Sequence, residues 1–92
     1  MRKRQPPDQP AKVARIGGPA IQGDRVKGLR ETRGWTLMEL GYRAKMQISD
    51  VSRVEHGKLD VRSSTLLRLV IALRTSADYL LGLSDDPRPA KT

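Results

Sequence analysis

Cysteine and phenylalanine are both absent from the 92-residue chain, and each absence narrows what the protein can be. Without cysteine there is neither a disulfide framework nor a thiolate metal site. His56 is the only histidine, so a metal ion would need carboxylates alone, and the sequence has no carboxylate cluster. We therefore expect no metal and no cofactor. Aromatic residues make up only 3% of the chain, so the core must consist of Leu, Val, Ile, Met and Ala.

Long hydrophobic runs are also missing. The longest is residues 69–73, far shorter than the roughly 20 residues that span a bilayer. No apolar stretch follows the basic N-terminus as it would in a secretory signal, so we expect a cytoplasmic protein without membrane contact. The sequence shows no nucleophile–base pair and no glycine-rich phosphate loop, and an enzyme is not expected.

Positive charge is abundant, with a formal net charge of +8. Residues 1–20 hold five basic residues, one acidic residue and four of the six prolines, a composition that favours a disordered basic arm. Residues 84–92 balance at zero charge and contain the other two prolines, so a disordered tail is expected there. The folded unit is predicted at residues 21–83. A basic surface favours polyanionic partners such as nucleic acid.

Residues 21–83 fit five helices, and no segment alternates with the period of two that a strand requires. We therefore expect a compact all-α fold. Thr36 and Glu39 match a capping box, in which each side chain satisfies an amide at the start of the helix. Gly34 and Gly82 are expected to end the helices before them, and Ser76 to cap the last one. The helices are expected near residues 24–33, 36–44, 48–56, 64–73 and 77–81.

The second and third helices have the spacing of a helix-turn-helix unit, with a break at residues 45–47. Gly41 lies inside the first of this pair, where glycine costs about 1 kcal/mol relative to alanine, so a close crossing by the next helix is expected. An ordinary antiparallel helix pair would explain the apolar spacing equally well. It would not explain why the third helix has so few apolar residues.

The third helix separates into two sides at about 100° per residue. Val51 and Val54 point inward, whereas the opposite side carries short or hydrogen-bonding side chains. Such a face suits base edges in a DNA groove, because Arg53 can bond guanine bidentately and Ile48 can contact a thymine methyl group. A solvated polar face is the alternative for any one of these residues. The outward residues are Ser49, Ser52, Arg53 and His56, with Gln47 and Ile48 at the N-terminus of the helix.

These segments together resemble the lambda-repressor-like helix-turn-helix family, of the Cro/C1-type (XRE-type) found in phages and prophages. The resemblance runs from about residue 23 to residue 83. It rests on Arg25-Val26-Lys27, Leu29-Arg30, Gly34-Trp35-Thr36, Glu39-Leu40, Val51-Ser52-Arg53-Val54-Glu55, Gly57-Lys58 and Ser76-Ala77-Asp78-Tyr79-Leu80-Leu81-Gly82.

The resemblance implies a recognition helix in the major groove and a homodimer on a palindromic operator. By position, the implied base-reading residues are Ile48, Ser49, Ser52 and Arg53. The implied or expected contacts to the DNA backbone are Thr36, Lys45, Gln47, His56 and Lys58. It also implies a structural ion pair between Arg30 and Glu55.

Three positions depart from the family pattern. Leu37 replaces a common Gln that braces the first base reader, which weakens the case for readout at that end. Lys45 stands where the turn usually has Gly, and it can adopt the left-handed conformation at a modest cost. Asp50 would repel phosphates, so we assign it to the start of the helix, where a carboxylate stabilises the exposed amides and the helix dipole.

The sequence therefore predicts a sequence-specific double-stranded DNA-binding regulator, in the first instance a repressor. The alternative is a protein-interaction module with this fold, antitoxin-like or binding RNA polymerase, which the apolar Ile48 and Leu37 favour. Arg2, Lys3 and Arg4 of the arm could contact DNA or remain solvated. Leucines 80, 81 and 83 could close the core, form the dimer contact, or both.

Overall fold

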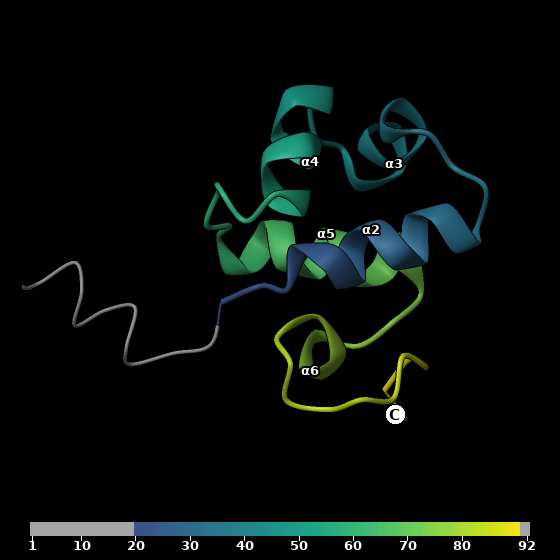
Figure 1. Cartoon of the computed structure of the whole chain (residues 1–92), viewed down its shortest axis with the longest axis vertical. Helices are drawn as coiled ribbons and strands as arrows, with labels where there is room; N and C mark the ends of the chain where they lie inside the picture. The colour runs from purple at the N-terminus through teal and green to yellow at the C-terminus, as the bar shows by residue number, and fades with distance from the viewer. Residues whose placement is uncertain (1–19, 91–92) are drawn as a thin grey trace, which may run out of the picture.

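The computed structural model describes residues 20–90 and confirms the all-α architecture. Five helices follow one another in this part of the chain, and none of them is long and apolar enough to cross a membrane. In Figure 1, α3 and α4 form the upper layer, α2 and α5 lie below them, and α6 lies beneath α2 and α5. The helices are α2 (Gly23–Thr32), α3 (Leu37–Ala44), α4 (Ile48–Glu55), α5 (Ser63–Leu73) and α6 (Ala77–Leu80).

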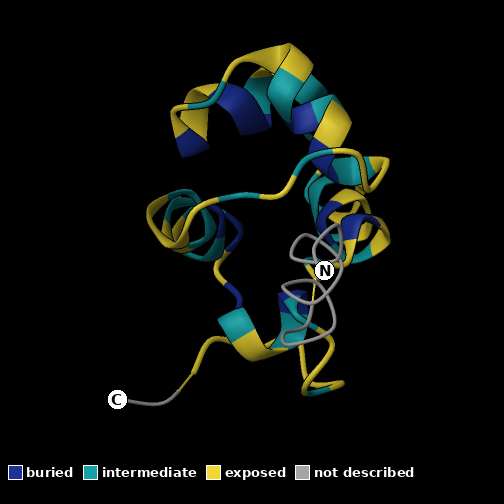
Figure 2. Ribbon diagram, turned by 90° about the vertical axis from the view of Figure 1, so that its left-hand side faces the viewer, coloured by how far each residue is buried: buried dark blue, intermediate teal, exposed yellow. Residues whose placement is uncertain are grey.

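The core lies where these helices meet, and it is aliphatic as the composition requires. Figure 2 shows the buried residues on the inward sides of the helices, with exposed residues around the outside. Because every helix contributes at least one fully buried side chain, no helix is an independent appendage. The fully buried residues are Val26, Leu40, Ala44, Val51, Val54, Leu69, Leu73 and Leu80.

The helix ends follow the local sequence signals. The Thr36 hydroxyl accepts a hydrogen bond from the Glu39 amide at 3.1 Å, and the Ser76 hydroxyl accepts one from the Tyr79 amide at 3.0 Å. The Glu39 carboxylate accepts from Arg43 at 2.7 Å, so only one half of the expected capping box is described. Gly34 terminates α2 with a φ of 74°, as expected of a left-handed terminator.

Gly41 permits the tight turn between α3 and α4. A Cβ atom at this position would lie 2.7 Å from the Met46 carbonyl oxygen and 3.6 Å from the Val51 side chain. The expected close approach is therefore present, but its nearest atom belongs to the turn rather than to the next helix. A second backbone contact fixes α2 on α4, because a Cβ atom at Gly23 would collide with the carbonyl oxygens of Val54 and Glu55.

The C-terminal segment is hydrogen-bonded to the helices before it. Residues 84–90 have no helix, yet the Arg25 guanidinium donates to the carbonyl oxygens of Tyr79 at 2.9 Å and Ser84 at 2.6 Å. The Thr75 hydroxyl donates to the Pro87 carbonyl at 2.7 Å. These hydrogen bonds satisfy backbone carbonyl groups of the segment. Such contacts do not follow from hydrophobic periodicity.

Candidate nucleic-acid interface

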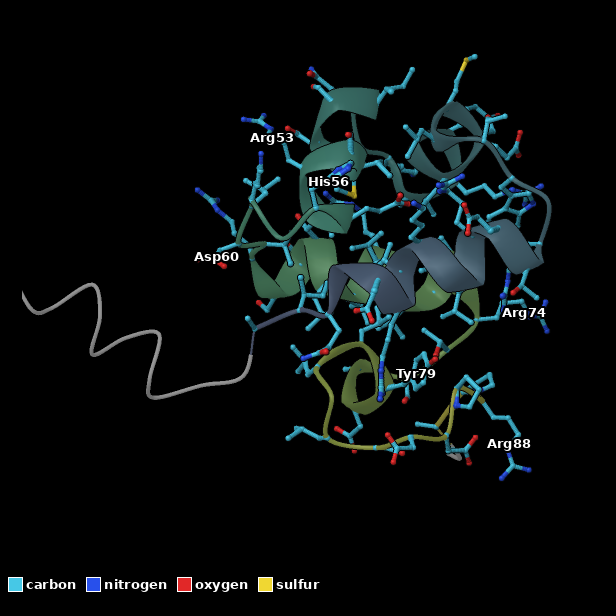
Figure 3. All side chains as sticks on the ribbon, in the orientation of Figure 1. Arg53, His56, Asp60, Arg74, Tyr79 and Arg88 are labelled. Carbon is cyan, nitrogen blue, oxygen red and sulfur yellow. The ribbon has the colours of Figure 1, made fainter. Side chains whose placement is uncertain are left out.

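The α4 helix presents one side to the core and the other to solvent. Val51 and Val54 are fully buried, and α4 packs against both α2 and α3. Ser49, Arg53 and His56 are exposed, and Figure 3 shows Arg53 projecting away from the helix bundle. The inward and outward assignment made from helical periodicity therefore agrees with the structure.

The outward residues of α4 differ in how far they are exposed. Ile48 is 47% exposed, which leaves its side chain available for a contact outside the domain. Ser52 is half-buried, so its side chain is less accessible than those of the other three residues expected to read bases. All four nevertheless project from one short helix.

Arg53 is not a free cation in this structure. Its guanidinium donates to the Asp50 carboxylate at 2.6 Å, and both side chains are substantially exposed, at 56% and 36%. Asp50 lies in the first turn of α4, as the helix-end assignment requires, but its oxygen is bonded to the neighbouring arginine. An exposed pair of this kind contributes little to stability, and its main effect is to orient Arg53 along the helix.

The turns that flank α4 carry exposed lysines. Lys45 has a φ of 57° and a ψ of 49°, the left-handed conformation expected for the residue that replaces glycine. Lys58 follows Gly57, whose φ is 72°, and the Lys58 amide donates to the Arg53 carbonyl at 2.8 Å. One lysine therefore lies beyond each end of α4.

The remaining residues expected to contact the DNA backbone are also exposed. Thr36 and Gln47 are the N-cap residues of α3 and α4, which places them at the positive ends of two helix dipoles. His56 is exposed, and its Nδ1 is 2.7 Å from the Ser52 carbonyl oxygen. Arg2, Lys3 and Arg4 lie outside the described residues.

Three residues beyond the sequence-based set complete this surface. Arg62, Thr65 and Arg68, from the loop before α5 and its first turns, line a cavity of about 450 Å³ together with Lys45 and Arg53. Arg68 Nε donates to the Ala44 carbonyl at 3.0 Å and its Nη2 to the Thr65 hydroxyl at 3.2 Å. Sequence reasoning missed them because only the packing of α5 under α3 brings residues 24 positions apart together.

Arg30 and Glu55 form the ion pair that the family resemblance implies. Arg30 Nε lies 2.6 Å from Glu55 Oε2 and Nη2 lies 3.1 Å from Oε1, so the pair is bidentate. Arg30 also donates to the Trp35 carbonyl at 2.8 Å. The hydrogen bond to Glu55 raises the pKa of Arg30 above its ordinary value. The side chains are 11% and 3% exposed, so the pair ties α2 to the end of α4 inside the domain.

The fold and this surface define an all-α helix-turn-helix domain whose second helix is buried on one side and polar on the other. Residues 23–81 match the family described as "Helix-turn-helix domain". The chain belongs to this family, in its lambda-repressor-like branch. A comparison with curated proteins gave no match.

Three solved structures illustrate the similarity. The P22 c2 repressor protein, in complex with synthetic operator 9T, is 26% identical with a TM-score of 0.66, over 70% of this chain and 97% of that one. The restriction-modification controller protein C.AhdI from Aeromonas hydrophila is 29% identical with a TM-score of 0.60, over 63% and 88%. The SinR protein, in its complex with the SinI protein, is 30% identical with a TM-score of 0.59, over 64% and 58%.

Proposed function

We propose that this protein is a sequence-specific double-stranded DNA-binding repressor that inserts α4 into the major groove. The observation that carries the proposal is the outward side of α4, where Ile48, Ser49 and Arg53 are exposed while the opposite side is sealed into the core. Base edges in the major groove offer partners for each of these side chains. The family, and the P22 c2 repressor solved with its operator, support the same reading.

Phosphate contacts would surround this helix and set its register on the duplex. Lys45 and Lys58 flank its two ends. Arg62 and Arg68 line the adjoining cavity with Lys45 and Arg53, and these four cations outnumber the carboxylates of Asp50 and Asp60 there. Thr36, Gln47 and His56 complete the proposed backbone contacts. In this arrangement the cations supply affinity for any sequence, and the few base readers supply the preference.

A homodimer on a palindromic operator would place one α4 in each half-site, roughly 34–36 Å apart. The apolar side of α5 is the surface that fits a second copy. Leu66, Leu67, Val70 and Ala77 line a cavity of about 400 Å³, and Leu67 is 57% exposed. Leu80 is fully buried and belongs to the core, whereas Leu83 is 65% exposed.

Selection of bound sequences from a pool of random duplex DNA tests the proposal directly. We expect an enriched palindromic motif, and recovery of no motif at moderate salt would refute sequence-specific binding. Arg53→Ala should relax the preference at one base pair, whereas Lys58→Ala should weaken binding to all sequences about equally. Leu67→Asp should abolish the dimer in sedimentation velocity, and a reporter carrying the motif over a promoter should show reduced transcription.

A protein-interaction module is the second candidate function, and exposed apolar residues on α3 favour it. Met38 is 64% exposed and Tyr42 is 82% exposed, and they lie four residues apart on α3, which places them on the same side of that helix. Capture from a nuclease-treated host lysate separates the two functions. An antitoxin-like or polymerase-binding protein retains its partner after nuclease, whereas proteins bridged by DNA are lost.

A further inference from the structure

A second cationic site lies at the corner where α2, α3 and the C-terminal end of α5 meet. Its cavity of about 610 Å³ is lined by Arg33, Trp35, Arg43, Ile71, Ala72 and Arg74. In Figure 3, Arg74 lies on the side of the molecule opposite to Arg53. The site is therefore separate from the surface proposed to contact DNA.

The arginines are arranged around the only tryptophan of the chain. The guanidinium carbon of Arg43 lies 4.3 Å from the Trp35 ring centroid, and that of Arg33 lies 6.0 Å from it. Arg33 also donates to the carbonyl oxygens of Leu29 and Leu73, and Arg43 donates to the Glu39 carboxylate at 2.7 Å. Stacking and hydrogen bonds thus hold two of the three cations in place.

Arg74 is the third cation of the site, and neither stacking nor a hydrogen bond to a described residue holds its guanidinium group. It is exposed, and among the described residues its guanidinium has no hydrogen bond or ion pair. Its backbone is left-handed, with a φ of 55°, a conformation that costs a non-glycine residue about 1–2 kcal/mol. No carboxylate is among the residues that line the cavity, and the neighbouring Glu39 is paired with Arg43. Among the described residues, Arg74 is therefore the arginine of this site whose charge no carboxylate or stacked ring engages.

The other walls of the cavity are apolar. Ile71 is 67% exposed, Ala72 is half-buried, and the Trp35 ring lies between the arginines. A ligand that fills this site needs an anionic group for Arg74 and an aliphatic or aromatic group for Ile71 and Trp35. A sugar–phosphate backbone satisfies only the first requirement, whereas a peptide with neighbouring acidic and apolar side chains satisfies both.

We propose that this corner is a docking site for an acidic peptide segment of a partner protein, in which carboxylates alternate with large apolar side chains. The carboxylates pair with Arg74 and with the outer edges of Arg33 and Arg43. The apolar side chains pack on Ile71 and Trp35. This proposal does not depend on DNA binding, because the two surfaces share none of the lining residues.

Trp35 reports on this site optically in the full-length protein. The probe is a synthetic peptide of alternating glutamate and leucine, without aromatic residues, titrated at physiological salt while tryptophan fluorescence is recorded. We expect a saturable change, and an equally long lysine–leucine peptide should produce none. No saturable change up to about 1 mM acidic peptide, the limit of weak specific binding, overturns the proposal.

Matched charge reversals locate the binding. Arg74→Glu should weaken the acidic peptide by about tenfold or more, as expected for loss of a charge-assisted pair. Lys27→Glu makes the same change in net charge at an exposed position of α2 outside the cavity, and it should leave the affinity within about twofold. Equal weakening by both variants would mean general electrostatic attraction and would overturn the proposal.

Two further measurements keep the result interpretable. Thermal unfolding checks that Arg74→Glu folds, and Arg74→Gly, which suits the left-handed backbone, replaces it if it does not. Binding of random duplex DNA should be unchanged in Arg74→Glu relative to Lys27→Glu. If Arg74→Glu instead loses DNA affinity selectively and DNA displaces the peptide, the corner belongs to a nucleic-acid surface and the peptide proposal is wrong.

Discussion

The two sides of α4 differ in what holds their side chains. On the inner side, Val51 and Val54 are fully buried and Glu55 is paired with Arg30, so each group has a partner from another helix. On the outer side, Ser49 and Arg53 are exposed, and the ion pair of Arg53 is with a residue of α4 itself. The inner side of this eight-residue helix therefore contributes to stability, while the outer side is left available for the DNA recognition that we propose. Substitutions should separate the two roles.

Removing the buried acid from the inner side should have the largest effect on stability. Glu55→Ala removes the bidentate partner of Arg30, whose side chain is 11% exposed, and leaves it only the more distant Glu31 carboxylate at 4.0 Å. This should lower the free energy of unfolding by roughly 3–5 kcal/mol. Urea denaturation measures this. The double variant Arg30→Met with Glu55→Leu should recover much of the loss, because it removes both charges. A loss below about 1 kcal/mol would show that the pair behaves as a surface pair.

Gly41→Ala tests whether a change in packing at the inner side of α4 also alters DNA binding by its outer side. The added Cβ would lie 2.7 Å from the Met46 carbonyl, so the turn before α4 must shift. We expect a net loss of about 1–2 kcal/mol, since overpacking outweighs the gain of about 1 kcal/mol that alanine brings to a helix. DNA affinity, measured by fluorescence anisotropy, should fall as α4 tilts. Gly28→Ala is the control, because nothing lies within 4 Å of that position.

Lys45→Gly should move stability and DNA affinity in opposite directions. Glycine relieves the left-handed strain at this position, which should stabilise the fold by about 0.5–1 kcal/mol. Loss of the ammonium group should weaken binding to every DNA sequence. It should also reduce the slope of log K against the logarithm of the salt concentration by about one unit. Arg74→Gly offers the matched comparison, because it should give a similar gain in stability without a loss of DNA affinity.

Asp50→Ala should have the smallest effect on stability and a measurable effect on the preference for the DNA motif. The carboxylate at the start of α4 contributes about 0.3–1 kcal/mol through the helix dipole. Its removal also frees Arg53 and removes an anion from the surface. Binding to random DNA should therefore strengthen, while preference for the selected motif should fall because Arg53 loses its fixed orientation. Quantitative binding to matched and mismatched duplexes checks this, and an unchanged preference would mean that Arg53 does not read a base.

The features that sequence alone predicted are local ones. The Thr36 cap depends on residues three positions apart, the Gly34 turn on one residue, and the burial of Val51 and Val54 on helical period. Each rests on backbone geometry that a short segment determines by itself. The left-handed conformation of Lys45 was expected from the family resemblance, because the family usually has Gly at this position of the turn.

The features that sequence missed join distant segments or concern choices between partners. Arg25 binds the backbone near Ser84, 59 positions away, and no periodicity signals such a contact. The pairing of Arg53 with Asp50 is short in sequence, yet an arginine at this position can turn toward a base, a phosphate or a carboxylate. Which partner it takes depends on the surroundings, and helical spacing does not encode them.

The close contact of Gly23 with the end of α4 restricts which substitutions α2 can accept during evolution. Position 23 lies against the last carbonyl groups of α4, so any side chain there would displace α4, the helix that we propose to contact DNA. Position 28, one and a half turns further along the same helix, opens to free space. Among descendants of this gene that keep the same DNA target, glycine should persist at position 23 while position 28 varies freely. The codon for position 23 would then indicate whether the proposed function has been retained.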